Sequence, residues 1–222
     1  MGNCPSFCMG RKYMCTISFK ERVRDVAIKN APVYENVFMK YEYLICSEAF
    51  ANGCHIIKAD KGNYLHLLGI HTALKPGDFF DKCIASGEKQ LTEDDFDFNK
   101  LGRSEKSVKG SVRQKITALP KMLDLFHQKL LAEDGFKKNE VECAFATTDN
   151  IFTLGFASSG RPKSLLKGNE LDKNKQKDVD LIFRKARGSS SKYKELIYGN
   201  KEYAIKYKDS IKDFVEPGFF KG

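Results

Sequence analysis

Residues 142–156 have the sequence Glu-Cys-Ala-Phe-Ala-Thr-Thr-Asp-Asn-Ile-Phe-Thr-Leu-Gly-Phe, in which two apolar runs flank a polar turn. Aromatic and β-branched residues favour strands, whereas Asp and Asn favour turns. The pattern therefore predicts a β-hairpin with strands over 142–147 and 151–156. Because a short turn makes its two strands antiparallel, the rest of the chain is interpreted around an antiparallel sheet.

Further strands are indicated on both sides of this hairpin. Residues 41–46 and 54–58 are aromatic and β-branched with a Gly-containing turn between them, which predicts a second hairpin. Residues 195–198 and 202–205 enclose a Gly-Asn pair and predict a third hairpin. Residues 179–187 are expected to add another strand.

Two helices are indicated by capping residues near the N-terminal end of this pattern. Ser18 is expected to cap a helix that Pro32 ends or kinks, since proline removes a helical hydrogen bond. Asp60 is expected to cap a short helix over 61–68, and Gly69 to stop it.

A reversal of charge precedes a third helical pattern. Residues 78–97 hold seven acids and two lysines, whereas residues 100–115 hold six Lys or Arg and one acid, Glu105. The second stretch continues as a helical pattern through Leu131, which Pro120 is expected to kink or divide.

The order of these elements predicts the α+β class, with N-terminal helices packed on an antiparallel sheet in a single domain. No repeat and no Pro-rich or Gly-rich linker divides the sequence. Residues 1–16 are expected to be a flexible leader and residues 17–222 the domain. Residues 1–6 also match an N-myristoylation pattern, but fold-like patterning begins only near Ile17, which favours a leader.

Composition excludes several classes of protein. The chain has 222 residues, of which 41% are hydrophobic and 30% charged, as in globular proteins. Its apolar runs fall far short of the roughly 20 residues of a membrane span, and no secretory signal is recognisable, so we expect a cytoplasmic protein without membrane contact. Seven scattered cysteines favour reduced thiols, and we expect neither a structural zinc nor any cofactor.

Basic residues are concentrated in the C-terminal third. Residues 158–212 hold fifteen Lys or Arg and seven Asp or Glu, so nearly all of the net charge of +9 lies there. Tyrosines lie between these cations, a composition that suits phosphate contacts with bases stacking nearby. A solvated lysine-rich face is an equally good interpretation of composition alone.

Four histidines are present, and two of them are candidates for proton transfer. His66 lies nearly opposite the apolar face of the short helix, and His71 follows just beyond Gly69. Imidazole titrates near neutrality, so such a pair can divide the base and acid roles in cleaving RNA. The alternative is that His66 is a surface residue and His71 a partly buried structural one. His55 and His127 are interpreted as structural.

Cations flank these histidines in sequence. Lys109 and Arg113 are spaced i, i+4 and are expected to clamp a phosphate from one helical face, with Gly110 letting it approach the backbone. No Walker, nucleophile-elbow or zinc-protease motif occurs. Residues 161–167 form a basic turn that either binds phosphate or is an edge strand with a solvated end.

Several short segments together resemble a known family. They are residues 63–72, 78–83, 91–96, 108–116, 146–150 and 162–166. In this order they resemble the fourth subgroup of phage-associated barnase/EndoU/colicin/RelE-like (BECR) nucleases, over roughly residues 35 to 200. The family pattern H-L-x-G is carried by His66, Leu67 and Gly69, and K-G-S-x-R by Lys109, Gly110, Ser111 and Arg113.

The resemblance implies a BECR-like fold, with helices on a sheet of about four strands, and a toxin-like endoribonuclease of a phage or mobile element. It implies metal-independent cleavage by the 2′-hydroxyl of RNA, which needs a base, an acid and a cation. The catalytic candidates are His66, His71, Lys109 and Arg113. The candidates for substrate binding are Lys115, Thr147, Thr148, Arg161, Lys163, Ser164 and Lys167.

Thr147 and Thr148 are included because hairpin ends present side chains to clefts. RNA is the expected partner, with an antitoxin or host protein as a further one. An alternative function is a non-catalytic phage-encoded module that uses the same fold to bind nucleic acid or to inhibit a host protein.

Overall fold

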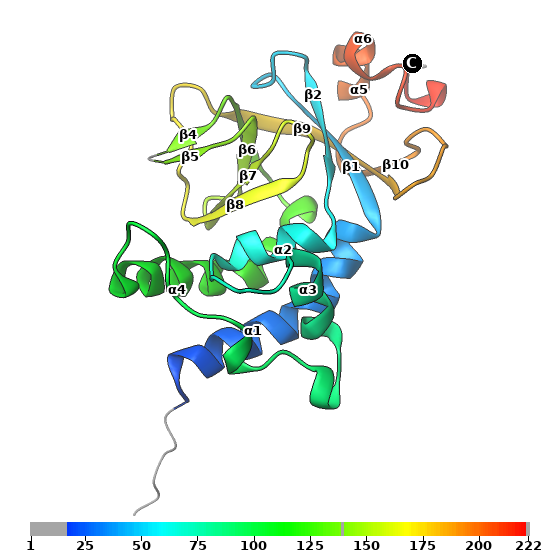
Figure 1. The fold of residues 1–222 in the computed structure, drawn as a ribbon. Helices are drawn as coiled ribbons and strands as arrows, with labels where there is room; N and C mark the ends of the chain where they lie inside the picture. The colour runs from blue at the N-terminus through cyan, green and yellow to red at the C-terminus, as the bar shows by residue number, and fades with distance from the viewer. Residues whose placement is uncertain (1–16, 139, 221–222) are drawn as a thin grey trace, which may run out of the picture.

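The computed structural model describes residues 17–138 and 140–220. Helices α1 to α4 form one layer, a curled sheet forms the next, and the short C-terminal helices lie beyond β1 and β9 (Figure 1). The expected leader, residues 1–16, lies outside the described residues. The α+β class with N-terminal helices on an antiparallel sheet is confirmed.

The helical elements begin and end as follows: α1 Phe19–Tyr34, the π-helix η1 Glu35–Met39, α2 Lys61–Leu68, α3 Pro76–Ile84, α4 Glu105–Met122, α5 Tyr203–Lys206, α6 Lys208–Ile211, and the 3-10 turns η2 Gly87–Lys89, η3 Glu93–Asp95, η4 Leu125–His127 and η5 Pro217–Phe220. The strands are β1 Tyr41–Ser47, β2 Cys54–Lys58, β3 Leu131–Asp134, β4 Lys137–Lys138, β5 Val141–Glu142, β6 Phe145–Thr148, β7 Phe152–Phe156, β8 Pro162–Lys167, β9 Lys177–Ala186 and β10 Glu195–Gly199.

The main sheet has eight strands in the order β2-β1-β9-β3-β6-β7-β8, with β10 also paired to β9. All named pairs are antiparallel. The expectation of about four strands is therefore too low, because β1, β2, β9 and β10 extend the meander β3-β6-β7-β8. The sheet curls until the β7–β8 turn reaches β2, where the amide of Lys58 donates to the carbonyl of Gly160 at 3.1 Å.

Apolar side chains fill both sides of the sheet. The main core lies between helices α1 to α4 and the inner face, and its largest members include Tyr34, Tyr64, Phe80 and Phe145. A second cluster packs the C-terminal segment onto β1 and β9, and a third lies under the segment that contains Leu171. Strands covered on both faces explain why the central runs are continuously apolar.

Three expectations about the helices are corrected. The first helix does not end at Pro32, because a π-turn follows and the amide of Glu35 donates to the carbonyls of Ala31 and Pro32. The third helix stops at Met122 rather than Leu131, and Pro120 lies in its last turn without dividing it. Proline at this position removes one helical hydrogen bond, and the helix ends two residues later.

The prediction of a third hairpin is wrong for its second strand. Residues 195–199 form β10, which pairs with β9, but α5 begins at Tyr203 instead of a strand. Ala204, Tyr207 and Ile211 are buried against β1 and β9, and this spacing is helical rather than alternating. The hairpins over β1–β2 and β6–β7 are confirmed, although the first strand of the latter starts at Phe145.

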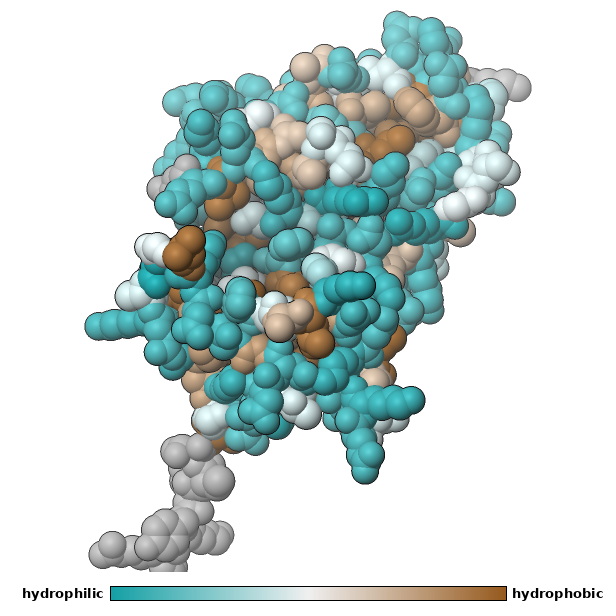
Figure 2. Space-filling view, viewed as in Figure 1, coloured by the Kyte–Doolittle hydropathy of each residue, from teal (hydrophilic) through white to brown (hydrophobic). Residues whose placement is uncertain are grey.

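The face of the molecule shown in Figure 2 is mostly hydrophilic, with hydrophobic residues gathered in small patches. Among the described residues, none of the helices combines the length and the apolar character needed to cross a bilayer.

Candidate functional site

The two stretches that carry the family patterns meet where α2 contacts α4. The ammonium of Lys115, on α4, donates to the carbonyl oxygen of His66, on α2, over 3.1 Å. Gly69 ends α2 with φ of +71°, and a Cβ there would lie 2.7 Å from Cδ of Lys115. Glycine is therefore required at this position for two reasons: the left-handed backbone conformation and the close approach of the Lys115 side chain.

Lys115 has an unusual proton affinity for a lysine. Burial, and next the positive charge of Lys100, lowers the pKa of Lys115 to about 8. Desolvation acts this way because it disfavours the charged form of an amine. Near neutral pH the amine therefore exists in both protonation states, as a proton-transfer group requires.

His71 is held against Asp97 by both backbone and side chain. The amide of His71 donates to the carbonyl of Asp97 at 3.0 Å, and the amide of Asp97 donates back at 2.8 Å. Nδ1 of His71 lies 3.3 Å from Oδ1 of Asp97, and 61% of the imidazole side chain is exposed. A carboxylate on one ring nitrogen fixes the orientation of the ring and leaves the other nitrogen for a substrate.

The acidity of Asp97 fits that role. Burial favours its neutral form, but bonds from Asn99 and His71 outweigh this, so the pKa of Asp97 lies below its ordinary value. The carboxylate is therefore charged at neutral pH, where it faces Nδ1 of His71.

Cations of α1 and α4 lie over an aromatic cluster. The rings of Phe19 and Phe98 are 5.2 Å apart, with Arg113 over Phe19 at 5.0 Å and Lys109 over Phe98 at 5.3 Å. Lys20 covers a third ring, that of Phe96, at 5.5 Å. Cation–π contacts of this kind hold long side chains in defined positions.

A cavity of about 350 Å³ lies close by, lined by Lys20, Asp97 and Lys109 but not by His71 or Arg113. It lies between the start of α1, residues 97–99 and the first turns of α4. His71 is only two residues from Gly69, a reach of at most about 7 Å, so the Lys115 contact belongs to the same region. The structure thus brings Asp97, the partner of His71, to the cavity that Lys109 lines, while Arg113 contacts Phe19 of the same cavity and Lys115 contacts His66.

Local pairing limits what two of these groups can do. Nζ of Lys109 lies 2.6 Å from Oε1 of Glu105, so a phosphate has to compete with that carboxylate. Gly110 is inside α4 with open space around a Cβ, and no close approach of another group depends on it. The side chain of Arg113 is exposed and pairs with no carboxylate among the described residues.

The other predicted residues lie away from this region. Thr147 and Thr148 are fully buried, so the interpretation that they face a cleft is wrong. Both lie on β6, a central strand covered on its two faces. The hydroxyl of Thr148 donates to the carbonyl of Phe152 at 2.6 Å, whereas that of Thr147 has no hydrogen-bond partner among the described residues.

The basic turn 161–167 forms β8 and its approach, at the edge of the sheet. Arg161 pairs with Asp60 at 3.3 Å, Lys163 donates to the carbonyl of Glu142 at 2.6 Å, and Ser164 is buried. Lys167 is exposed. The edge-strand interpretation is confirmed, and phosphate binding by these residues stays a prediction.

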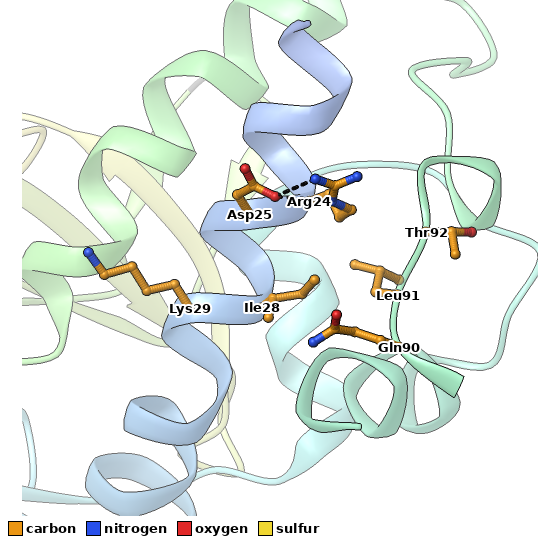
Figure 3. A pocket seen from close by; sticks show the side chains of 7 residues that line it. All are labelled: Arg24, Asp25, Ile28, Lys29, Gln90, Leu91 and Thr92. Atoms are coloured by element: carbon orange, nitrogen blue, oxygen red, sulfur yellow. Dashed lines mark hydrogen bonds and ion pairs between the residues drawn. The ribbon is translucent and has the colours of Figure 1, made fainter. Parts of the chain in front are cut away.

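Two further cavities are less suited to phosphate chemistry. In the first, Figure 3 shows Arg24 between α1 and residues 90–92, with Lys29 directed away from it. Arg24 has Glu21, Asp25 and Glu93 within 3.6 Å, so its charge is already neutralised.

The other cavity, of about 780 Å³, lies at the free edge of β2 and is lined by His55. Nε2 of His55 lies 3.0 Å from Oδ1 of Asp134, and its ring stacks on Phe145 at 4.1 Å. Asp134 also accepts from the amide of Ala51, so the pair ties the β1–β2 hairpin to β3. This supports the structural interpretation of His55.

Sequence reasoning missed Asp97, Asn99 and Phe19. Asp97 lies in the acidic stretch, where its charge resembles solvated surface. The alternation Phe96-Asp97-Phe98 was the available signal, because it places the carboxylate opposite two buried rings. Within the described residues no cluster of three metal-ligating side chains occurs.

A model of the family described as phage-barnase-EndoU-colicin E5/D-RelE-like nuclease 4 matches residues 28–208. The chain belongs to this nuclease family. The match spans all four helices of the main layer except the start of α1, and every strand of the sheet. The BECR-like architecture expected from the sequence is thereby confirmed, and nucleic acid is the class of substrate that the family implies.

No curated protein and no solved structure matches the chain. The roles of individual residues therefore rest on the geometry described above.

Proposed function

We propose that this chain is an endoribonuclease that cleaves RNA through attack of the 2′-hydroxyl, without a metal ion, in a toxin-like role for a phage or mobile element. The contact between Lys115 and the carbonyl of His66 carries the proposal, because it joins residues 63–72 to residues 108–116, two of the segments that resemble the family. The nuclease family supports it as well.

The proposed reaction needs a base, an acid and a cation, and the candidate residues supply a side chain for each. A base removes the 2′-hydroxyl proton, the oxygen attacks phosphorus, and an acid protonates the departing 5′-oxygen, which leaves a 2′,3′-cyclic phosphate. His71, oriented by Asp97, serves as one of these groups, and His66 or the amine of Lys115 serves as the other. Arg113 and Lys109 stabilise the charge that develops on the phosphate.

The test is incubation of the purified protein with total bacterial RNA in EDTA, followed by mapping of the fragment ends. Discrete fragments ending in cyclic phosphate are expected from the natural protein, and not from His71→Ala. His127→Ala is the matched control, because His127 is an exposed histidine on η4 outside the site. Intact RNA at protein concentrations that shift it on a gel overturns the proposal and favours a non-catalytic binding module.

A further inference from the structure

Two cysteines lie directly opposite each other on neighbouring strands. Cys46 of β1 pairs with Cys54 of β2 in the antiparallel register of this hairpin. Both are free thiols, and both belong to the cluster that packs the C-terminal segment onto β1 and β9, so their side chains share one face of the sheet. Directly opposite residues of an antiparallel pair have Cβ atoms about 4.5–5.5 Å apart.

The hydrogen bonds show which of the two kinds of antiparallel pair this is. The amide of Ser47 donates to the carbonyl of Gly53 at 3.2 Å, so the pair next to Cys46 and Cys54 is a hydrogen-bonded one. Bonded and non-bonded pairs alternate along an antiparallel ladder. At the other end of β2 the amide of Lys58 bonds away from β1, as the same alternation requires. Cys46 and Cys54 are therefore a non-hydrogen-bonded pair.

This kind of pair has the spacing that a disulfide needs. Non-hydrogen-bonded partners have Cα atoms about 4.5 Å apart and the closer side chains, against about 5.5 Å for bonded partners. A disulfide joins Cα atoms about 4.4–6.8 Å apart and Cβ atoms about 3.5–4.5 Å apart. The other two cysteines of the described residues, Cys83 and Cys143, belong to two different core clusters, so neither has such a partner there.

A small oxidant has access to the pair from one side. Cys46 is fully buried, whereas Cys54 is half-buried and lines the cavity of about 780 Å³ at the free edge of β2. That volume lies within the range of small-molecule sites, about 300–1,000 Å³. Sγ of Cys54 donates to the carbonyl of Ser210 at 3.6 Å, and a thiol is a weak donor, so little opposes its rotation. Cys54 is therefore the sulfur that reacts first.

We propose that Cys46 and Cys54 form a redox pair, which a small-molecule disulfide converts into a cross-strand disulfide that fastens β2 to β1. The thiolate of Cys54 attacks one sulfur of the small disulfide, whose S–S bond breaks as a mixed disulfide forms and one thiol leaves. Cys46 then attacks Sγ of Cys54 and expels the second thiol. The cysteines are oxidised, the small disulfide is reduced, and the two cysteine protons end on the two released thiols.

Burial sets the rate of this exchange. It raises the pKa of the Cys54 thiol, and burial together with the neighbouring Cys54 raises the pKa of Cys46. The thiolate is the attacking form, so the exchange is slow at neutral pH and is followed at mildly alkaline pH. The pair lies on the face of the sheet away from helices α1 to α4, and the inference does not rest on the proposed function.

Mass spectrometry of the oxidised chain tests the bridge. The folded full chain is incubated with oxidised glutathione, its remaining thiols are alkylated in urea, and it is digested with trypsin. Residues 41–58 form one tryptic peptide that contains both cysteines. This peptide is expected to be lighter by two hydrogen atoms and to carry no alkyl group, while Cys83 and Cys143 are alkylated. Glutathione retained on Cys54, or alkylation of both Cys46 and Cys54, overturns the proposal.

A melting curve tests whether the bridge fastens the hairpin. The disulfide is expected to raise the melting temperature by about 5 °C, and dithiothreitol to reverse the increase. The same treatment of Cys54→Ser should leave the melting temperature unchanged. Cys46→Ala is the second variant, because it places no polar group at the buried position. Oxidised natural protein that melts with the reduced form, or an equal increase in both variants, overturns the proposal.

Discussion

The ammonium of Lys115 donates to the carbonyl oxygen of His66 over 3.1 Å, with Gly69 alongside. This contact couples α4 to the end of α2. Lys115 is desolvated and has no carboxylate partner among the residues that the structure describes.

Replacing Lys115 with Met is expected to change how stability depends on pH. Because burial lowers the pKa of Lys115 to about 8, from 10.5, the unfolded chain holds a proton between these values that the folded protein has lost. Stability contributed by this group therefore rises with pH across that window, by at most about 1.4 kcal/mol per unit. Urea denaturation at pH values within and below the window measures the difference between the two proteins.

The control for this prediction is Lys121→Met, since Lys121 is exposed near the end of the same helix. It should leave the pH dependence of the natural protein in place. A Lys115→Met protein whose stability follows the natural one at every pH would show that the amine is not desolvated.

Gly69→Ala is expected to destabilise the fold by about 1–2 kcal/mol, because the residue would keep a left-handed backbone conformation. The new methyl group also displaces the side chain of Lys115, so cleavage should fall together with stability. Gly110→Ala is the matched substitution, inside a helix with open space, and should stabilise by about 0.5–1 kcal/mol. Equilibrium denaturation compares the two, and an equal effect on both would contradict the geometry.

Asp97→Asn is expected to lower the rate of RNA cleavage by roughly 10- to 100-fold while the fold is retained. The amide keeps the shape of the carboxylate but removes the negative charge that faces Nδ1 of His71. Single-turnover kinetics measures the cleavage rate, and a melting curve shows whether the fold is retained.

The matched control for that prediction is Asp134→Asn, which alters the other carboxylate–histidine pair of the described residues, at His55. Its cleavage rate should stay near that of the natural protein. A large loss there, with none at Asp97, would place the chemistry in the β2 cavity instead.

Thr147→Val should be neutral or stabilising by about 1 kcal/mol, because the buried hydroxyl of Thr147 has no hydrogen-bond partner. Thr148→Val should destabilise by about 1–2 kcal/mol, because its hydroxyl bonds the carbonyl of Phe152 and the amide of Asn150. Chemical denaturation of both variants tests the assignment, and RNA cleavage is expected to be unaffected by Thr147→Val.

Arg113→Gln should weaken RNA binding at all sequences and reduce the salt dependence of the binding constant by about one phosphate contact. Lys121→Gln serves as the comparison. The test is to measure RNA affinity at a series of salt concentrations. If the logarithm of the binding constant falls with the logarithm of salt concentration at the same slope for both variants, Arg113 does not contact a phosphate.

Local signals predicted most of the elements but not all their ends. Ser18 caps α1 and Asp60 caps α2 because those interactions involve residues three apart in sequence. The prediction placed the helix breaks at Pro32 and Pro120. Both helices continue for two residues beyond the proline, to Tyr34 and Met122, whose side chains are buried in the core. Residues 202–205 have strand-like composition, yet packing of Ala204 and Tyr207 on the sheet makes them helical.

The candidate site shows the same division. Sequence alone predicted the α+β class, the family resemblance and the candidate residues His66, His71, Lys109 and Arg113, because composition, caps and short patterns are local properties. Only the tertiary structure decided that Asp97 orients His71, that Lys115 reaches His66, and that the threonines of β6 are buried. These depend on which face of each element is covered by a segment distant in sequence, and no local pattern contains that information.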